Sequence, residues 1–294
     1  MIPNMKFYVI SIVSIFLALA IGIYIGFSLD ANEVIVDQRD DLVTKLEEKF
    51  DYLKEENQNL KGEVDTLELE NSQYANFSEV IYPEIIKNRL SGLKVAIIET
   101  NDEYIYSGIG KTLGMAGADV VSIVTIKDKF LNEELLKEIY LNGEKNVEIK
   151  ESIIDKGVED LTNAIISGDN EDIIQLYREY GLINIVGNAD EPVDYIVIAG
   201  GSEKEDFDRI NYLDRKIVEV SKKLETPIIG IEKTKVNFSY ISEYKNYRIS
   251  TVDNVDTVIG KVALIMAMEG RPGYYGVKPS AESLIPNPSE AILE

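Results

Sequence analysis

Hydrophobic positions along the chain follow three successive patterns. Residues 7–29 carry no charged side chain, and about 20 apolar residues are needed to cross a hydrocarbon core of about 30 Å. From residue 36 to residue 74, mainly apolar positions recur every seven residues. From residue 93 onward, short β-branched runs alternate with helical stretches. The pattern predicts an apolar membrane helix, a coiled coil and an α/β domain, in that order.

The seven-residue repeat defines two positions, a and d, that would form the seam of the coiled coil. Position a holds Val36, Val43, Phe50, Asn57, Val64 and Asn71, and position d holds Leu46, Leu53, Leu60, Leu67 and Tyr74. A buried asparagine at position a fixes register and strand number in parallel dimers, so Asn57 and Asn71 favour a parallel homodimer. The flanking charges do not enforce a homodimer, because Glu63 of one chain would face Glu68 of the other. A hetero-coil with another membrane-anchored protein is therefore the alternative.

Charges around the apolar helix predict its orientation. Lys6 precedes the helix, while acidic residues outnumber Arg39 in the segment that follows, which predicts a cytoplasmic N-terminus and an extracytoplasmic bulk of the chain. Within the helix, a face of small residues comprises Ala18, Gly22 and Gly26. Such a face lets two helices approach closely. A cleaved signal peptide is the competing interpretation, because residues 18–20 resemble a processing site, but the continuing apolar run favours an uncleaved anchor.

The alternation beyond residue 93 predicts a doubly wound parallel sheet with a flavodoxin-like strand order. The predicted strands are 94–100, 119–125, 195–199, 227–231 and 248–252, and the predicted helices are 107–116, 206–223 and 255–269, with an inserted helical region at 132–180. This order would place a crevice at the carboxyl ends of the first and third strands. Its lip would comprise Asn101, Asp102, Gly200, Gly201 and Ser202. The predicted organisation is an anchor at 1–29, a stalk at 30–78, an α/β domain at 79–270 and a tail at 271–294.

Apparent binding motifs in this domain have simpler structural explanations. Residues 107–112 end like a phosphate loop but lack its first glycine. Gly200 and Gly201 could present N–H groups to an anion, but a structural turn off the sheet is the favoured interpretation. Asp253 and Asp256 straddle the start of the last helix at capping spacing, which predicts helix capping and no bound metal.

Composition excludes several classes of function. The chain carries 52 acidic and 30 basic residues, a net charge of −22. Such a chain repels nucleic acids and anionic membrane surfaces. It contains no cysteine and no histidine, so it lacks thiolate chemistry, the usual general base at neutral pH and the commonest transition-metal ligand. We therefore expect no enzymatic activity and no bound cofactor.

Three motifs carry a family resemblance. Residues 16–22 in the anchor, residues 250–256 before the last helix and residues 273–276 in the tail occur in this order. Together they resemble the MctB-type family, usually labelled copper transporter, over the full length of the chain. The resemblance implies a membrane or envelope protein linked to copper transport or homeostasis. SteB-like relatives imply control of a peptidoglycan hydrolase together with a membrane partner. The tail is expected to pack beside the sheet or to link to a neighbour.

The residues suit direct copper handling poorly, since copper prefers thiolate, thioether or imidazole ligands. The soft ligands of the chain are Met1, Met5, Met115, Met266 and Met268. The last three fall in predicted core helices, where methionine usually fills space. The leading hypothesis is therefore a noncatalytic membrane scaffold whose coiled coil positions a protein-docking α/β domain. Copper homeostasis and a small-molecule sensor at the crevice are the alternatives.

Overall fold

The computed structural model describes residues 5–142, 152–169 and 171–287, without the side chains of residues 29–40, 107, 142 and 171. The side chain of the predicted seam residue Val36 lies outside this description. So do the soft ligand Met1, residues 143–151 of the inserted region and residues 288–294 of the tail. The chain divides into two compact units, with the boundary between Ala75 and Asn76. Each unit is described by itself.

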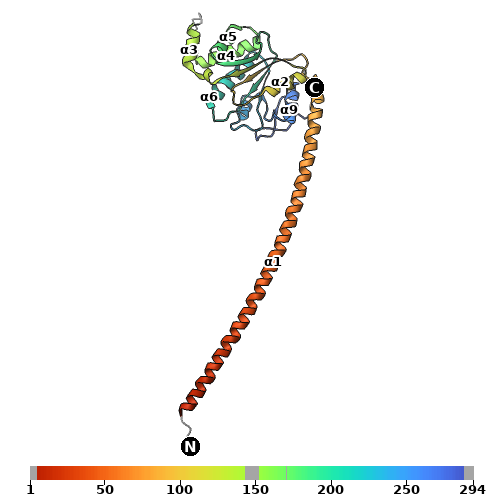
Figure 1. Ribbon diagram of the computed structural model, residues 1–294. Helices are drawn as coiled ribbons and strands as arrows, with labels where there is room; N and C mark the ends of the chain where they lie inside the picture. Colours follow the sequence, from red (N-terminus) through yellow and green to blue (C-terminus); the bar gives the residue numbers. More distant parts are fainter. Residues whose placement is uncertain (1–4, 143–151, 170, 288–294) are drawn as a thin grey trace. The chain divides into compact units, whose positions relative to one another are not determined.

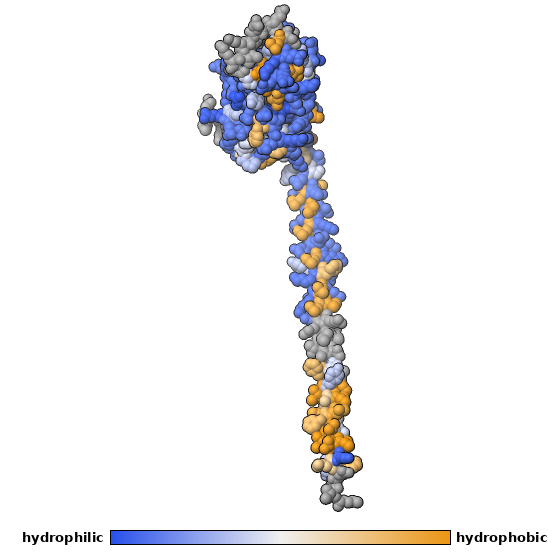
Figure 2. Space-filling model, turned by 90° about the vertical axis from the view of Figure 1, so that its left-hand side faces the viewer, coloured by the Kyte–Doolittle hydropathy of each residue, from blue (hydrophilic) through white to orange (hydrophobic). Residues whose placement is uncertain are grey.

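Every described residue of the first unit belongs to helix α1, which spans Met5–Ile86 and ends within the second unit. Its segment Met5–Ser28 has a mean hydropathy of 2.5 and is long and apolar enough to cross a membrane. Figure 2 shows apolar residues over most of the visible face of this segment. A Cβ atom added at Gly22 or Gly26 would meet nothing within 4 Å. These glycines are therefore open to a neighbouring helix.

Beyond the apolar segment, α1 has a hydrophilic surface with interrupted apolar patches (Figure 2). The exposed large apolar side chains here include the predicted seam residues Val43, Leu46, Phe50, Leu53, Leu60, Val64, Leu67 and Tyr74. Asn57 and Asn71 are exposed as well. A single α1 thus leaves the described seam in contact with solvent.

A seven-stranded sheet forms the centre of the second unit. Its strands are β1 (Lys94–Glu99), β2 (Asp119–Ile126), β3 (Ile183–Gly187), β4 (Tyr195–Ala199), β5 (Ile228–Ile231), β6 (Ser250–Val252) and β7 (Tyr274–Tyr275). The order across the sheet is β3-β2-β1-β4-β5-β6-β7. Every neighbouring pair is parallel except β2 and β3. All five predicted strands are present, whereas β3 and β7 are additions at the two edges.

Helices cover both faces of the sheet (Figure 1). They are α2 (Ser107–Met115), η1 (Asp128–Leu131), α3 (Glu133–Asn142), α4 (Ile153–Ser167), α5 (Glu171–Glu179), α6 (Phe207–Arg209), the π-helix η2 (Ile210–Asp214), α7 (Arg215–Lys223), α8 (Ile241–Asn246) and α9 (Val258–Met268). Alternate side chains of β1 point to opposite cores. Ile98 belongs to the core that includes residues of α4, α5, α7 and α8, whereas Ile97 belongs to the core that includes residues of α2, α9 and the end of α1. The predicted helix 206–223 is interrupted by η2.

The tail packs beside the sheet, which is the first of its two predicted alternatives. The backbone N–H of Thr251 donates to the carbonyl oxygen of Gly273 at 3.0 Å, and that of Asp253 donates to Tyr275 at 3.1 Å. Strand β7 therefore continues the parallel ladder beyond β6.

The prediction that Asp253 and Asp256 cap the last helix is wrong. Helix α9 starts at Val258, later than predicted, and its N-cap is Thr257, whose side chain accepts the N–H of Gly260 at 3.0 Å. Asp256 instead accepts the N–H of Thr234 at 2.7 Å. The two carboxylates lie too early in the chain to reach the free N–H groups of the first turn.

Candidate functional site

Buried polar residues gather directly after the parallel strands. They are Thr100 and Asn101 after β1, Ser202 after β4, Glu232 after β5, and Asp253 and Asn254 after β6. The carboxyl ends of parallel strands meet at one edge of a sheet, which is where ligands bind in open α/β sheets. We call this region the carboxyl edge. Because buried polar groups need hydrogen-bond partners, their partners reveal what the edge is built to do.

The five residues predicted to line a crevice lie at the ends of β1 and β4. The Nδ2 atom of Asn101 donates to the carbonyl oxygen of Gly201 at 2.6 Å. The hydroxyl of Tyr106 donates to the carbonyl oxygen of Gly200 at 2.7 Å. Gly201 has a φ of +90°, in the left-handed region that favours glycine, as the predicted turn requires.

Asp102 and Ser202 also have partners within the chain. Asp102 is exposed and forms an ion pair with Lys127 at 2.8 Å. The hydrogen bond from Lys127 lowers the pKa of this carboxyl below its ordinary value. The hydroxyl of Ser202 donates to the carbonyl oxygen of Lys204. The polar side chains at the predicted lip thus serve to hold its loops.

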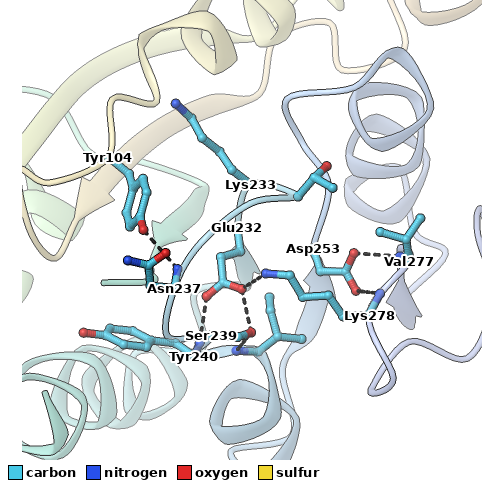
Figure 3. Close-up of polar contacts among 12 residues, drawn as sticks. Tyr104, Glu232, Lys233, Asn237, Ser239, Tyr240, Asp253, Val277 and Lys278 are labelled. Carbon is cyan, nitrogen blue, oxygen red and sulfur yellow. Dashed lines mark hydrogen bonds and ion pairs between the residues drawn. The ribbon is translucent and has the colours of Figure 1, made fainter. Parts of the chain in front are cut away.

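Tyr104 ties together the loops that follow β1, β4 and β5. Its hydroxyl accepts the N–H of Asn237 at 3.1 Å (Figure 3) and donates to the carbonyl oxygen of Ser202 at 3.4 Å. The side chain of Glu103 accepts the N–H of Glu203 at 2.6 Å. Three loops that are far apart in sequence therefore share one hydrogen-bond network.

Glu232 is a fully buried carboxylate at the end of β5. It accepts the N–H of Tyr240 at 2.7 Å and the hydroxyl of Ser239 at 2.6 Å. The ammonium of Lys278 completes the set (Figure 3). Burying a charge is unfavourable unless it is paired and hydrogen-bonded, and these partners meet that need. Glu232 thereby joins β5, the start of α8 and the tail.

Asp253 holds the tail from the end of β6. Its two carboxylate oxygens accept the N–H of Val277 at 2.7 Å and the N–H of Lys278 at 2.9 Å (Figure 3). Gly276 lies between these groups and β7, with a φ of +139°. A Cβ atom at this position would overlap the carboxylate of Asp253. Only glycine therefore lets the chain pass so close to the aspartate.

Thr100 connects the carboxyl edge to a buried cluster around Asp214. The carboxylate of Asp214 accepts hydrogen bonds from the hydroxyl of Thr100 at 3.3 Å and from the hydroxyl of Tyr244. The guanidinium of Arg209 donates to the carbonyl oxygen of Thr100 and pairs with Asp128. Burial raises the pKa of Asp214 to about 7. This carboxyl therefore titrates near neutral pH.

We call the second unit, which begins at Asn76, the head. The raised pKa of Asp214 makes the stability of the head depend on pH. The ordinary value is 3.8, and the folded value is about 7, so the folded state holds the proton more tightly. The contribution of this proton to the free energy of unfolding is complete below about pH 4. It falls by about 1.4 kcal/mol per pH unit as the pH rises to 7. Asp214→Asn does not titrate and should gain stability relative to the unchanged chain over this interval. Urea unfolding at several pH values tests this, and a constant difference would contradict it.

Glu232 and Arg209 were not predicted as site residues, because no motif surrounds them. A signal was nevertheless present for Glu232, which directly follows the buried apolar strand β5. A charged residue at the end of such a strand must lie at the carboxyl edge and find a partner there. Arg209 gave no such signal, because its partner Asp128 is 81 residues away.

One family model matches nearly the whole chain. This model, described as copper transport outer membrane protein, MctB, covers residues 1–286. The chain belongs to the MctB family. A comparison of this MctB chain with curated proteins finds no match. The match confirms the resemblance carried by residues 16–22, 250–256 and 273–276, and the family description connects the chain with copper transport at a general level.

Two of these MctB motifs meet in the structure. Residues 250–256 include β6 and Asp253, and residues 273–276 include β7 and Gly276. The carboxylate of Asp253 approaches Gly276 and binds the two N–H groups that follow it. The hydrogen bonds that hold the tail to Asp253 therefore join two of the segments that carry the family resemblance.

Three of the five methionines of this MctB chain lie in helices α2 and α9. Met266 and Met268 are buried in α9, and Met115 packs against the same core. Within the described residues, no group of three or more His, Cys, Asp or Glu side chains could hold a metal ion. Thioethers inside a packed core usually act as filler, which is the role that burial indicates for Met266 and Met268.

Proposed function

We propose that this MctB-family chain is a noncatalytic, single-pass membrane scaffold that positions its α/β head through a paired stalk. The observation that carries the proposal is the exposed seam of α1, whose leucines and valines recur at positions a and d. Fully burying a leucine side chain stabilises by about 1.5–3 kcal/mol. A second helix with the same periodicity would bury these side chains, and a parallel arrangement matches Asn57 and Asn71 at position a.

A docking role for the head is supported by two buried carboxylates that hold its loops in place. Glu232 and Asp253 are buried and bonded to partners within the chain. The parallel strands in the order β2-β1-β4-β5-β6 support a flavodoxin-like head. Such a head would present its carboxyl edge as a rigid surface.

The proposed topology places the N-terminus in the cytoplasm and the head outside it. Lys6 before the apolar segment and the acidic residues after it support this orientation. Ala18, Gly22 and Gly26 would extend the pairing into the membrane, because small residues let helix backbones approach. The partner helix is a second copy or another membrane protein. Control of a cell-envelope hydrolase is the role implied by SteB-like relatives, and copper homeostasis is the second candidate, favoured by the family description.

Single-cysteine cross-linking tests stalk pairing. Because the chain has no cysteine, Leu53→Cys and Glu55→Cys each carry one thiol. Leu53 is at position d, facing the partner, whereas Glu55 is at the outward position f. Mild oxidation in the membrane should link Leu53→Cys to a second copy. If the coil is heterotypic, a short thiol-to-amine cross-linker at this cysteine should capture one other membrane protein. Glu55→Cys is the control and should give far less product. Equal yields of cross-linked product from the two variants would refute the pairing. So would the absence of any product from Leu53→Cys with both oxidation and the cross-linker.

A further inference from the structure

Three loops at the carboxyl edge each expose one large apolar side chain. Ile105 follows β1 and is 71% exposed, Phe207 follows β4 and is 61% exposed, and Phe238 follows β5 and is 40% exposed. A single exposed apolar residue is ordinary on a protein surface. Here, however, three of them lie in the segments that follow β1, β4 and β5, and these segments are hydrogen-bonded to one another. We call these three residues the apolar rim.

The backbone beneath the apolar rim is fixed. Ser202 and Phe238 exchange two backbone hydrogen bonds, of 3.1 and 2.9 Å. Phe207 starts α6, in which Arg209 is buried and donates to the carbonyl oxygen of Thr100. These bonds are additional to those of Tyr104. A surface held in one conformation loses little entropy when a partner binds.

Acidic residues flank Phe207 in the sequence. Residues 203–208 read Glu-Lys-Glu-Asp-Phe-Asp. Of the four carboxylates in this loop, only Asp206 forms an ion pair within the described part of the chain, with Arg209 at 3.3 Å. An exposed aromatic face attracts cations, and arginine more often than lysine. Unpaired carboxylates beside the ring strengthen that attraction.

Charge complementarity selects one class of occupant. The chain has a net charge of −22, so a second acidic head and an anionic lipid surface are both repelled. We propose that the apolar rim is the docking site for a segment of another protein in which arginine or lysine residues alternate with apolar residues. The proposal rests on the scaffold function above and adds the chemistry of the partner that the head receives.

A peptide-binding measurement tests the docking site. The full chain in zwitterionic nanodiscs is titrated into a labelled synthetic peptide of alternating arginine and leucine, with empty nanodiscs as the blank. The rim variant combines Phe207→Ser, Glu205→Gln and Asp208→Asn. We expect its Kd to be about tenfold weaker, because a cation–π contact and two ion pairs at an exposed site each contribute modestly.

A control variant removes one exposed apolar side chain and two exposed carboxylates from another part of the head. Val186→Ser removes an exposed apolar side chain from β3, and Glu134→Gln with Glu138→Gln removes two exposed carboxylates from α3. Its Kd should stay within about twofold of the unchanged chain. Because all six positions are exposed, both variants should keep the same circular dichroism and unfolding midpoint, which separates binding from folding.

Several outcomes would overturn the inference. They are equal weakening in the rim and control variants, unchanged binding in both, rim-dependent binding to vesicles that contain an anionic phospholipid, and rim-dependent self-association in sedimentation. The Leu53→Cys cross-link is measured in the same variants. If the rim and control variants bind the peptide equally well but the cross-link persists, only the docking proposal fails. If the cross-link is absent while the rim binds the peptide, the paired scaffold fails instead.

Discussion

Replacing Leu60 with aspartate is expected to separate the paired stalk. Leu60 occupies position d and is 54% exposed on a single α1, so each stalk of a homodimer would bury one such leucine. Losing two buried leucines removes at least about 3 kcal/mol, or more than about a hundredfold in the dissociation constant, and two facing aspartates add repulsion. Sedimentation of the detergent-solubilised chain measures the change. Because the proposed role requires pairing, the variant should also fail to complement a strain that lacks the protein.

Leu69→Asp is the matched control for this experiment. Leu69 lies on the same helix and is 61% exposed, but it occupies the outward position f. The same chemical change there should leave pairing and complementation intact. Equal dissociation by the two substitutions would show that the seven-residue repeat does not define the interface. Pairing that survives Leu60→Asp would show that the seam is elsewhere.

Replacing Lys278 with alanine is expected to destabilise the head by about 3–5 kcal/mol. This is the usual result when one partner of a buried ion pair is removed and the other charge stays buried. Glu232 is fully buried and keeps only the N–H of Tyr240 and the hydroxyl of Ser239. Urea unfolding of the full chain, followed by the near-ultraviolet dichroism of its tyrosines, measures the loss.

Lys137→Ala is the control for an ion pair in solvent. Lys137 and Glu133 lie 3.0 Å apart on α3, and both side chains are more than half exposed. Such pairs contribute about 0.5 kcal/mol or less. A loss of similar size in the two variants would mean that the pair of Lys278 and Glu232 is solvated and does not anchor the tail.

The central parallel strands β1, β4 and β5 could be predicted because they are buried on both faces. A strand of this kind is a continuous apolar run, and residues 195–199 and β4 coincide. The edge strands gave weaker signals. Strand β3 is largely exposed and antiparallel to its neighbour, and β7 has only two residues. Their pairing depends on tertiary contacts such as the bonds between Asp253 and the tail, which no local pattern contains.

The candidate site was predictable in place but not in detail. A topological rule put Asn101 and Gly201 at the same edge, and they share a hydrogen bond. The same rule says nothing about Arg209 or Asp214, and it places Glu232 at the edge without naming its partner Lys278. The partners of all three residues come from distant parts of the chain. The coiled coil stays a prediction, because its partner helix lies outside a single chain.

The attachment of the tail has a consequence for how the head assembles. Strand β7 is the edge of the sheet, and Asp253 and Glu232 receive their partners from residues 277 and 278. A nascent chain that has emerged only as far as α9 would hold both carboxylates without those partners. Final closure of the head therefore waits until residues 277 and 278 have left the ribosome, and premature termination before Gly273 should yield a product that proteases remove.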